Sequence, residues 1–509
     1  MTSRDGAATE RLARAGDAQA IRDVLARYWR GVDRRDAALV ASTYHPDAFD
    51  DHGYYQGPVD GFVASLEPGV WGYFENTQHF AGQIDVELDG DARARVESYA
   101  EAHHVRSEPD GARRDLVYGL RYVDRFEKRG GEWRIAHRIC AWDWHRVDEH
   151  VGLPLPDSYF RGRHSHEDPV FAHPQRAGAR VAPSDLAAKR ACADVLMRYA
   201  RGVDRCAPEL VRSTYHADAY DDHGGYQGDA DGFVAWVKPT VMDAFDVTMH
   251  ELGNMLIEVE GDRAFAETYA IAHHVGARSP APTDLVMGVR YVDRLERRGG
   301  EGAEWRIAHR AMSFEWERSA AIGSQAALDE GLRGARDGSD PVLAARAPAA
   351  ADAVARGEVY DALVRSCRGL DRRDDAALRA AFHEDAEIAH GAFRGGPGGY
   401  VAFATRALRA PFRTTMHKLG QVLVELGAGG DVAECEAYVD AHFVASEGGR
   451  DTVARVVGMR FLDRFERRGG AFRIARREVR LEWQHEAPLA ALDPRWTLGR
   501  PDGGDPVHA

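Results

Sequence analysis

Apolar residues near the start of the chain recur at the spacing of an amphipathic helix. Intervals of three, four, seven and eleven positions separate the apolar side chains Ile21, Val24, Leu25, Tyr28 and Val32. One face of a helix repeats in this way, so the pattern predicts a helix that weakens near Gly31. A second helix is predicted over 37–44, with Asp36 as its N-cap. His45-Pro46-Asp47 ends it, because proline cannot continue a helix.

Farther along, the apolar period changes from helical spacing to two. Residues 92–105 and 115–129 alternate between apolar and polar side chains and are rich in β-forming residues. A Gly130-Gly131 turn leads into a further strand that starts at Glu132, so the last two strands form a hairpin. Helices followed by antiparallel strands predict an α+β unit, a cone-shaped barrel in which a curved antiparallel sheet wraps around the N-terminal helices. Such a cone encloses a cavity of the kind that holds apolar ligands.

The whole pattern occurs three times. A segment that reads RGVDRRDAALVASTYHPDAFDDHG in its first copy starts at Arg30, Arg201 and Arg368. A second segment, first read as GLRYVDRFEKRGGEWRIAHR, starts at Gly119, Gly288 and Gly458, and each copy closes with Asp-Pro-Val at 168–170, 340–342 and 505–507. The copies lie 171 and then 167 residues apart, too far for a solenoid repeat. We therefore expect three tandem domains, 1–172, 173–346 and 347–509.

Composition and charge narrow the choice of partners and compartment. The chain has 509 residues and a formal net charge of −15, which argues against a nucleic-acid backbone or an anionic membrane surface as a partner. No apolar run reaches the length of a membrane span, and the N-terminus lacks the apolar core of a secretory signal. The five scattered cysteines form no C-x-x-C pair, so we expect reduced thiols in a cytoplasmic protein.

An aspartate and a histidine keep one separation in all three copies. The spacing is 46 residues in the pairs Asp33–His79, Asp204–His250 and Asp371–His417. An Asp–His pair is a simple device for proton transfer near neutral pH, because the carboxylate fixes the imidazole tautomer while the other ring nitrogen takes a proton. The alternative is a salt bridge from Asp33 to Arg30 or Arg34 beside a core histidine.

A tyrosine precedes this aspartate. Tyr28 lies five positions before Asp33, so their side chains point about 140° apart on an ideal helix. They converge on one cavity only if the helix unwinds near Gly31. Tyr199 is the counterpart in the second copy, and Ser366 takes the place in the third. The tyrosine is either a phenol donor to a substrate oxygen or an interior residue with a bonded hydroxyl.

The strand pair His103-His104 presents only one imidazole to either face of a sheet. We favour His103 as the inward residue, with Tyr99 on the same face, because the third copy keeps this histidine where His104 becomes Phe443. The counterparts of His103 and Tyr99 are His273 and Tyr269 in the second copy and His442 and Tyr438 in the third. It stays open whether the Ala100/Ala102 face lines the cavity instead, with His104 entering it.

Two other sets of polar residues recur. Arg138 and Arg310, on the final strand, are either exposed strand arginines or groups that steady a leaving group or an enolate oxygen. Asp50-Asp51-His52, near His45, has the composition of a metal site. Consecutive strand residues cannot all face one ion, and the third copy has Ile388-Ala389-His390, so we expect no metal.

Together these residues resemble the SnoaL-like branch of the nuclear transport factor 2-like superfamily, and the similarity is greatest to scytalone dehydratase, bile acid 7α-dehydratase and hexachlorocyclohexane dehydrochlorinase. The resemblance rests on Y-x-x-x-x-D at Tyr28/Asp33, on the isolated strand histidine His79 and on the RYVDRFEKRGGEWRIAHR hairpin. It implies a cone-like α+β barrel and a reaction without a cofactor. Histidine removes a proton next to an activating group, and water or halide leaves.

The resemblance also implies roles for individual residues. His79 and His250 are the general bases, oriented by Asp33 and Asp204, while Tyr28 and Tyr199 donate to a substrate oxygen. His103 and His273 take the second polar strand position, and Arg138, Arg310, Tyr99 and Tyr269 contact the substrate. The third copy keeps Asp371, His417 and His442 but has lost the counterpart of Tyr28, the acidic pair and the second histidine of the strand pair, so its site is degenerate.

Members of the dehydratase branch commonly form homotrimers. Three fused copies therefore predict a monomer whose domains pack as a pseudo-trimer, with the third unit as a structural partner. The expected function is a cofactor-independent lyase, a dehydratase acting on a small hydrophobic hydroxylated substrate of polyketide, terpenoid or steroid type. The alternatives are a cyclase or isomerase with the same dyad, or a non-catalytic small-molecule-binding protein.

Overall fold

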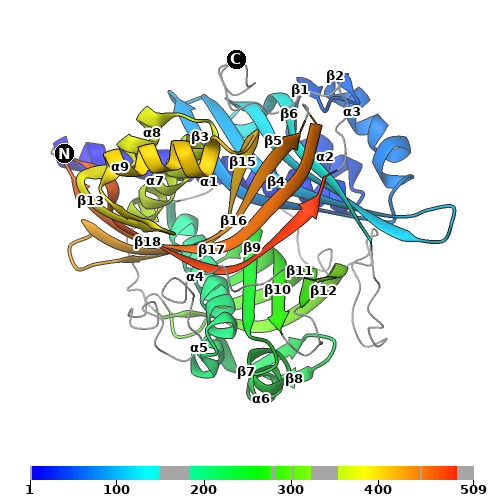
Figure 1. Cartoon of the computed structure of the whole chain (residues 1–509). Coiled ribbons are helices and arrows are strands. Elements are labelled where there is room, and N and C mark those ends of the chain that lie inside the picture. Colours follow the sequence, from blue (N-terminus) through cyan, green and yellow to red (C-terminus); the bar gives the residue numbers. More distant parts are fainter. Residues whose placement is uncertain are drawn as a thin grey trace.

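The computed structural model describes residues 3–149, 183–276, 283–300, 303–321, 353–447 and 450–489. Both predicted domain boundaries and all three Asp-Pro-Val segments lie outside the described residues. The described part forms three α+β units of one design, coloured blue to cyan, green, and yellow to red in Figure 1.

The units repeat one order of elements. The first unit contains α1 (Ser3–Asp33), α2 (Ala37–Ser42), β1 (Tyr44–Asp51), β2 (Gln56–Pro58), α3 (Val59–Leu66), the π-helical turn η1 (Glu67–Trp71), β3 (Asn76–Asp89), β4 (Arg93–Ser107), β5 (Arg113–Arg129) and β6 (Glu132–Glu149). The second contains α4 (Pro183–Asp204), α5 (Pro208–Ser213), β7 (Tyr215–Asp222), β8 (Gln227–Asp229), α6 (Ala230–Val237), η3 (Lys238–Met242), β9 (Val247–Glu260), β10 (Arg263–Gly276), β11 (Thr283–Arg297) and β12 (Trp305–Ala321). The third contains α7 (Ala353–Asp371), α8 (Asp375–Ala380), β13 (Phe382–His390), β14 (Phe393–Gly395), α9 (Pro397–Phe403), η7 (Ala404–Arg409), β15 (Thr414–Leu426), β16 (Val432–Glu447), β17 (Arg450–Arg468) and β18 (Ala471–Pro488).

Each unit has one six-stranded sheet. The strand order is β2-β1-β6-β5-β4-β3 in the first unit, and the other two units repeat it. All neighbours run antiparallel except β1 and β6 and their counterparts, which are parallel. The predicted α+β unit with a sheet and N-terminal helices is confirmed, and its sheet is open, since the two ends of the strand order are different strands. The strands that carry the dyad histidines, β3, β9 and β15, are therefore edge strands.

The local elements follow the sequence closely at the start of the unit. Asp36 is the N-cap of α2, and its carboxylate accepts the Leu39 N–H at 2.8 Å. The helix ends at Ser42, earlier than predicted, and Pro46 lies inside β1. The first helix does not unwind at Gly31. A Cβ there would lie 2.8 Å from Val40 Cγ2, so the glycine allows α1 and α2 to pack closely.

The two faces of the sheet have different neighbours. On β4, Ala100 and Ala102 belong to the apolar core of their own unit. The residues that alternate with these alanines along β4 point to the opposite face. One of them, Tyr99, packs with Met416 and Val444 of the third unit. Each unit therefore buries one face of its sheet against its own helices and the other against a neighbour.

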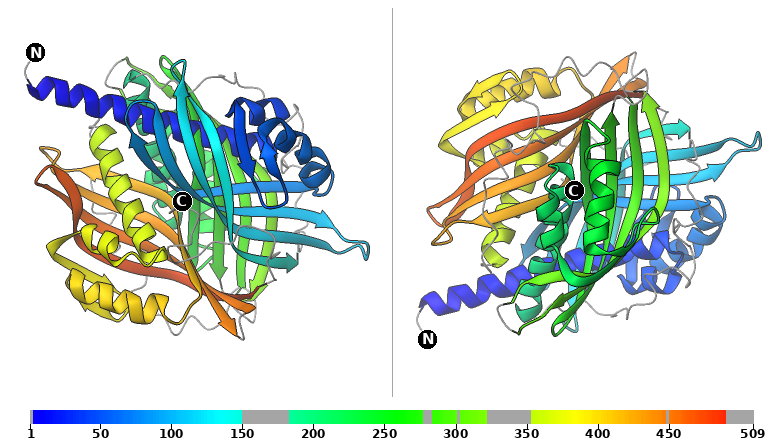
Figure 2. Two further views of the ribbon diagram at one scale, coloured as in Figure 1. Left: turned by 90° about the horizontal axis from the view of Figure 1, so that it is seen from above. Right: turned by 90° about the horizontal axis from the view of Figure 1, so that it is seen from below.

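The three units surround a common centre, where β3, β9 and β15 contact one another pairwise (Figure 2). An arginine three residues before each dyad aspartate pairs with a glutamate of a neighbouring unit: Arg30 with Glu267, Arg201 with Glu436 and Arg368 with Glu97. The pairs run from unit one to two, two to three and three to one. Each unit is therefore ion-paired with both of the others, in a cyclic order.

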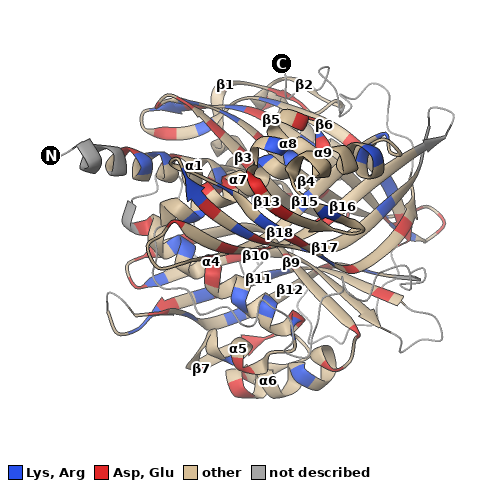
Figure 3. Ribbon diagram, turned by 60° about the vertical axis from the view of Figure 1, so that its left-hand side comes forward, with Lys and Arg blue, Asp and Glu red and all other residues tan. Residues whose placement is uncertain are grey.

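Charges of both signs are interspersed over all three units, on strands as well as helices (Figure 3). The net negative charge is therefore not gathered on one element. Among the residues that the structure describes, no helix combines the length and apolar character needed to cross a membrane.

Candidate active site

Asp33 holds His79 by both its ring and its main chain. The carboxylate is fully buried at the end of α1, with Oδ1 2.7 Å from His79 Nδ1. The His79 main-chain N–H donates to Oδ2 at 2.9 Å, and Thr77 Oγ1 donates to Oδ1 at 2.9 Å. An ionised carboxylate only accepts hydrogen bonds, so Nδ1 carries a proton, and in the neutral form of the ring Nε2 is the nitrogen with the free lone pair.

The charge state of Asp33 agrees with this tautomer. Burial by itself raises the pKa of the Asp33 carboxyl, but the His79 ring and the Arg34 guanidinium outweigh it, and the pKa is lowered. The pKa of Asp204 is lowered in the same way, against burial, by His250 and Arg205. Arg30 and Arg34 also have carboxylate partners in the second unit, Glu267 and Glu315. Asp33 is therefore hydrogen-bonded to His79, and a salt bridge to Arg30 or Arg34 alone does not account for its position.

The other two units repeat the arrangement. His250 Nδ1 lies 2.6 Å from Asp204 Oδ1, and its N–H donates to Oδ2 at 2.9 Å. His417 Nδ1 lies 2.6 Å from Asp371 Oδ1, with the N–H contact at 2.8 Å. The constant spacing in the sequence therefore corresponds to three formed Asp–His pairs.

The three histidines differ in access. The side chains of His79 and His250 are 8% exposed, whereas that of His417 is 1% exposed. Within the described part of the chain, His417 Nε2 is buried and has no hydrogen-bond partner. We call the third dyad closed, because its ring is fully enclosed, and the first two reachable, because a small part of each of their rings is exposed.

The ring beside each reachable dyad is the second histidine of the strand pair. The centroid of His104 lies 5.2 Å from that of His79 in an edge-to-face contact, and His274 lies 5.4 Å from His250. Phe443 takes this place beside His417 at 5.6 Å. Burial, and then the neighbouring dyad imidazole, lower the pKa of both His104 and His274 to about 3. These rings are therefore neutral near pH 7.

The prediction that His103 is the inward residue is wrong. Its ring stacks on Trp316 of the second unit at 3.8 Å, and its Nδ1 lies 2.6 Å from Asp115. His273 stacks likewise on Trp483, and His442 on Trp144. Strand alternation sends these side chains to the face that a neighbouring unit covers. The alternative holds, in which Ala100 and Ala102 face the unit's own core and His104 points toward the dyad.

The same alternation moves Tyr99 and Tyr269 away from any substrate of their own unit. Tyr99 packs among residues of the first and third units, and Tyr269 packs with Phe80 and Val105 of the first unit. Their predicted role in substrate contact is therefore not supported by their position. Both are buried at the interfaces between units.

Tyr28 belongs to a second polar group that the sequence did not assign. Its hydroxyl lies 3.0 Å from His52 Nε2, and His52 Nδ1 makes a short contact with Asp50 Oδ1. Tyr44 donates to the other oxygen of Asp50 at 2.7 Å. Tyr28 is thus bonded to the histidine of a second Asp–His pair. The signal in the sequence was the repeated Asp-Asp-His, considered only as a metal site.

This second group is present in the second unit and lost in the third. Tyr199 lies 3.0 Å from His223 Nε2, and His223 pairs with Asp221. In the third unit Ser366, Ile388 and Phe382 replace the tyrosine, the aspartate and the second tyrosine. The retained His390 bonds to Tyr400 instead, at 2.9 Å.

Arg138 lies beneath Tyr28 and is fully buried, so it is not an exposed strand arginine. Its guanidinium binds both oxygens of Asp124 at 2.7 Å and lies 4.1 Å from the centre of the Tyr28 ring. Arg310 repeats this with Asp293 and Tyr199. The predicted direct contact with a leaving group does not fit a cation already held by a carboxylate. Its position supports the tyrosine.

Comparison with known proteins agrees with this architecture. A family model described as a SnoaL-like domain matches the chain three times, at residues 13–139, 184–311 and 351–478. The matches together span about three quarters of the chain. The chain belongs to the SnoaL-like family. All three Asp–His pairs lie inside matched SnoaL-like segments. No curated protein sequence matches the chain significantly.

Several solved structures are similar to one SnoaL-like unit. A hexachlorocyclohexane dehydrochlorinase, LinA type 2, is 20% identical over 27% of this chain and 90% of its own, with a TM-score of 0.24. LinA type 3 from Novosphingobium barchaimii LL02 is 18% identical over 28% and 99%, with a TM-score of 0.26. A protein provisionally assigned as a scytalone dehydratase, from Novosphingobium aromaticivorans, is 21% identical over 28% and 95%, with a TM-score of 0.24.

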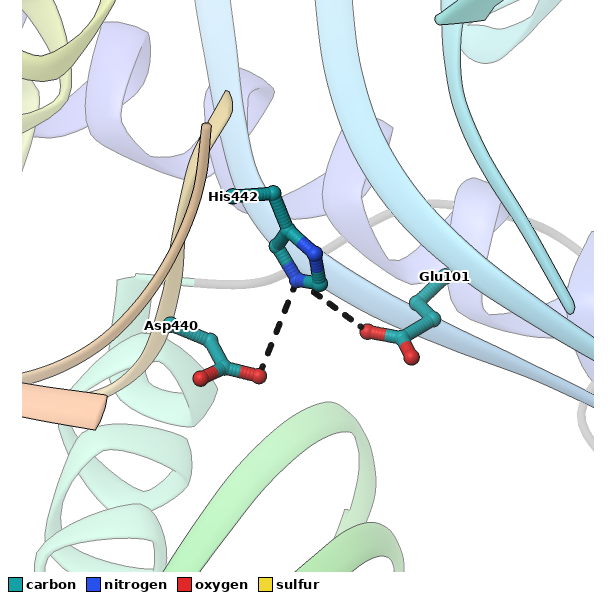
Figure 4. A group of neighbouring side chains, drawn as sticks. All are labelled: Glu101, Asp440 and His442. Atoms are coloured by element: carbon teal, nitrogen blue, oxygen red, sulfur yellow. Dashed lines mark ion pairs between the residues drawn. The ribbon is translucent and has the colours of Figure 1, made fainter. Parts of the chain in front are cut away.

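One group with metal-ligand spacing occurs among the described residues, where the three SnoaL-like units meet. Figure 4 shows His442 between the carboxylates of Glu101 and Asp440, with its Nε2 3.6 and 3.8 Å from them. The Lys418 ammonium lies 2.7 Å from Glu101, 3.4 Å from Asp440 and 3.6 Å from Glu251. The lysine thus brings to these carboxylates the positive charge that a metal ion would supply.

Buried neutral histidines should make this SnoaL-like protein sensitive to acid. Burial above all lowers the pKa to about 3 for His104, His274, His390 and His485. The unfolded chain titrates near 6.5, so it binds more protons than the folded chain between these values. Stability should fall as pH drops through this window, by up to about 1.4 kcal/mol per pH unit for each histidine. Urea unfolding at several pH values measures this slope.

A matched variant checks the origin of the acid sensitivity. His104→Phe copies the residue that the third unit carries at Phe443. This variant should reduce the slope of the unfolding free energy against pH by the contribution of one histidine, up to about 1.4 kcal/mol per pH unit. A slope equal to that of the unaltered protein would show that His104 is not a buried neutral imidazole.

Proposed function

We propose that the protein is a cofactor-independent lyase of the dehydratase type, with working sites in the first and second units. The SnoaL-like family includes lyase- and isomerase-type enzymes, and the dyads supply the chemistry that such reactions need. The substrate is a small hydrophobic hydroxylated molecule of polyketide, terpenoid or steroid type. The observation that carries the proposal is that Asp33 accepts hydrogen bonds from both the main-chain N–H and the ring Nδ1–H of His79. Asp204 does the same for His250.

The dyad performs the proton transfer. Nε2 of His79, unprotonated because Asp33 holds the proton on Nδ1, removes a proton from the carbon next to an activating carbonyl. The buried carboxylate stabilises the imidazolium that forms. The electron pair makes the carbon–carbon double bond as the carbon–oxygen bond breaks. The imidazolium then returns its proton to the departing hydroxyl, so water leaves and the histidine is neutral again.

The second polar group stabilises the charge that develops on the substrate. When substrate is bound, the Tyr28 hydroxyl turns its one proton from His52 Nε2 to the carbonyl oxygen, while Asp50 holds the His52 ring beside the phenol. The pKa of Tyr28 is raised, mainly by burial, so the phenol keeps its proton and remains a donor. Arg138 under the ring, bound by Asp124, keeps this group rigid. The second unit repeats every member of the arrangement.

A panel of hydroxylated carbonyl compounds from the three classes tests the proposal. Turnover without added cofactor should give a product lighter by one water, detected by mass spectrometry. A product of unchanged mass would indicate an isomerase or cyclase that uses the same dyad. Ligand binding without any product would indicate a binding protein, and the dehydratase proposal would be withdrawn.

A further inference from the structure

The main chain of each dyad histidine is hydrogen-bonded to a side-chain amide of another unit. Gln421, in the third unit, donates from Nε2 to the His250 carbonyl at 2.7 Å and accepts from the Leu252 N–H at 2.9 Å. Asn254, in the second unit, does the same for His79 and Ala81 at 2.9 and 2.6 Å. The neighbour's amide thus clamps the strand at the histidine and two residues beyond.

The third clamp closes the cycle. Gln83, in the first unit, donates to the His417 carbonyl at 2.7 Å and accepts from the Leu419 N–H at 2.9 Å. Two clamps therefore hold reachable dyads, and the third holds the closed one. The sequence carries a simple signal for all three, because glycine followed by Gln or Asn comes three and four residues after each dyad histidine.

The clamps fill a gap in the hydrogen bonding of edge strands. A carbonyl and the N–H two residues later point to the same side of a strand, where β3, β9 and β15 have no partner strand in their own sheets. The amide takes the place that the peptide group of another strand would occupy. All three amide side chains are buried, so losing one leaves two main-chain groups without partners.

Close approach of the neighbouring strands makes the clamp possible. A Cβ at Gly253 would lie 2.6 Å from the Ala81 carbonyl oxygen, so only glycine fits directly before Asn254. At Gly420 a Cβ would lie 3.2 Å from Glu251 Cβ. The glycine directly before Asn254 and the one before Gln421 therefore allow strands of different units to approach closely.

The clamp and the dyad together fix the histidine from both sides. At His250 the main-chain N–H and the ring are bonded to Asp204, and the carbonyl is bonded to Gln421. The direction in which Nε2 points follows from the main-chain position and the ring orientation. A shift of the strand would move Nε2 relative to a bound substrate without breaking the Asp–His pair.

We propose that Gln421 and Asn254 are positioning residues that act across unit boundaries, Gln421 on the second dyad and Asn254 on the first. The assignment rests on the proposed function of those dyads. It gives the closed third unit a role in the reaction, because this unit supplies the residue that orients His250. Each reachable site is then incomplete without the next unit along the chain.

Gln421→Leu tests the proposal in backgrounds with a single working site. With His79→Ala, only the second site works, and Gln421→Leu should lower kcat by about 100-fold with little change in KM, as expected for a displaced base. With His250→Ala, only the first site works, and the same substitution should leave kcat unchanged. Equal losses in both backgrounds would overturn the assignment.

Two further variants separate positioning from general loss of stability. Gln83→Leu removes the equivalent pair of hydrogen bonds at the closed dyad, so it should lower the melting temperature by a similar amount without lowering kcat. Gln421→Asn, which copies Asn254, should restore most of the rate. A loss of kcat in Gln83→Leu as large as in Gln421→Leu would mean that the amides act only on folding.

A readout without turnover keeps the clamp separate from the proposed chemistry. Histidine labelled with ¹⁵N gives ring resonances that report the Nδ1–H bond, and the His250 signal is identified by its loss in His250→Ala. Gln421→Leu should shift the His250 signal and leave that of His79 in place. If the protein turns over no substrate but this shift occurs, the clamp stands and the dehydratase proposal falls. An unmoved His250 signal would overturn the clamp.

Discussion

Replacing Asp33 and Asp204 together by asparagine should lower kcat by about 10,000-fold, the size of effect that a wrong histidine tautomer has in serine proteases. In each pair one carboxylate oxygen accepts the main-chain N–H and the other accepts the ring Nδ1–H. An amide has only one acceptor oxygen. If that oxygen binds the main-chain N–H, the NH₂ faces Nδ1 and moves the ring proton to Nε2. The base then has no lone pair for the substrate.

Ligand affinity should change little in this double variant, because the carboxylates face the histidines rather than the substrate. Steady-state kinetics and calorimetric binding of a product or substrate analogue measure the two quantities. Asp371→Asn is the matched control, since it places the same amide in the closed third dyad. Its kcat should equal that of the unaltered protein. A double variant that keeps its rate would remove the dyads from the mechanism.

The second large effect concerns the number of working sites. His79→Ala and His250→Ala should each remove one site, so kcat per chain should fall to that of the remaining one. The double substitution should reduce the rate to background, at least about 1,000-fold lower, because no base remains. The reason is access, since only these two dyad rings are partly exposed.

His417→Ala separates formation of a dyad from its use. The third pair has the same hydrogen bonds as the other two, but its Nε2 is buried. We therefore expect an unchanged kcat and a lower melting temperature, measured by scanning calorimetry. A fall in kcat by about a third would instead mean that the third site opens during turnover.

Much of the local structure was predictable from the chain itself. The 3.6-residue spacing before Val32 and the capping residue Asp36 led to the helices, and Gly130-Gly131 led to the last hairpin. Both glycines have positive φ, 61° and 86°, which such a turn requires. The cone-shaped α+β unit was predicted too, but not that its sheet stays open, because whether β2 and β3 meet depends on contacts that no local pattern records.

The site was predictable only in part. The 46-residue separation pointed to the Asp–His pairs, because the same spacing occurs in three copies of differing sequence. The structure forms the pair in all three. Strand alternation placed His103 and His104 on opposite faces, but it did not tell which face a neighbour covers. Tertiary contact with Trp316 decided that. Arg138 was misplaced for a similar reason, since its partner Asp124 becomes adjacent only through the register of β5 and β6.

The amino-acid order alone determined that this chain is three related α+β units, each with one aspartate and one histidine able to pair. These properties depend on the spacing of residues within a unit and on the repetition of the unit, and both can be read directly from the sequence. The tertiary structure decided which dyad rings are partly exposed and which unit contacts the main chain of each dyad histidine. Gln421 and His250 are 171 residues apart, and their contact exists only because edge strands of different units meet at the centre of the molecule.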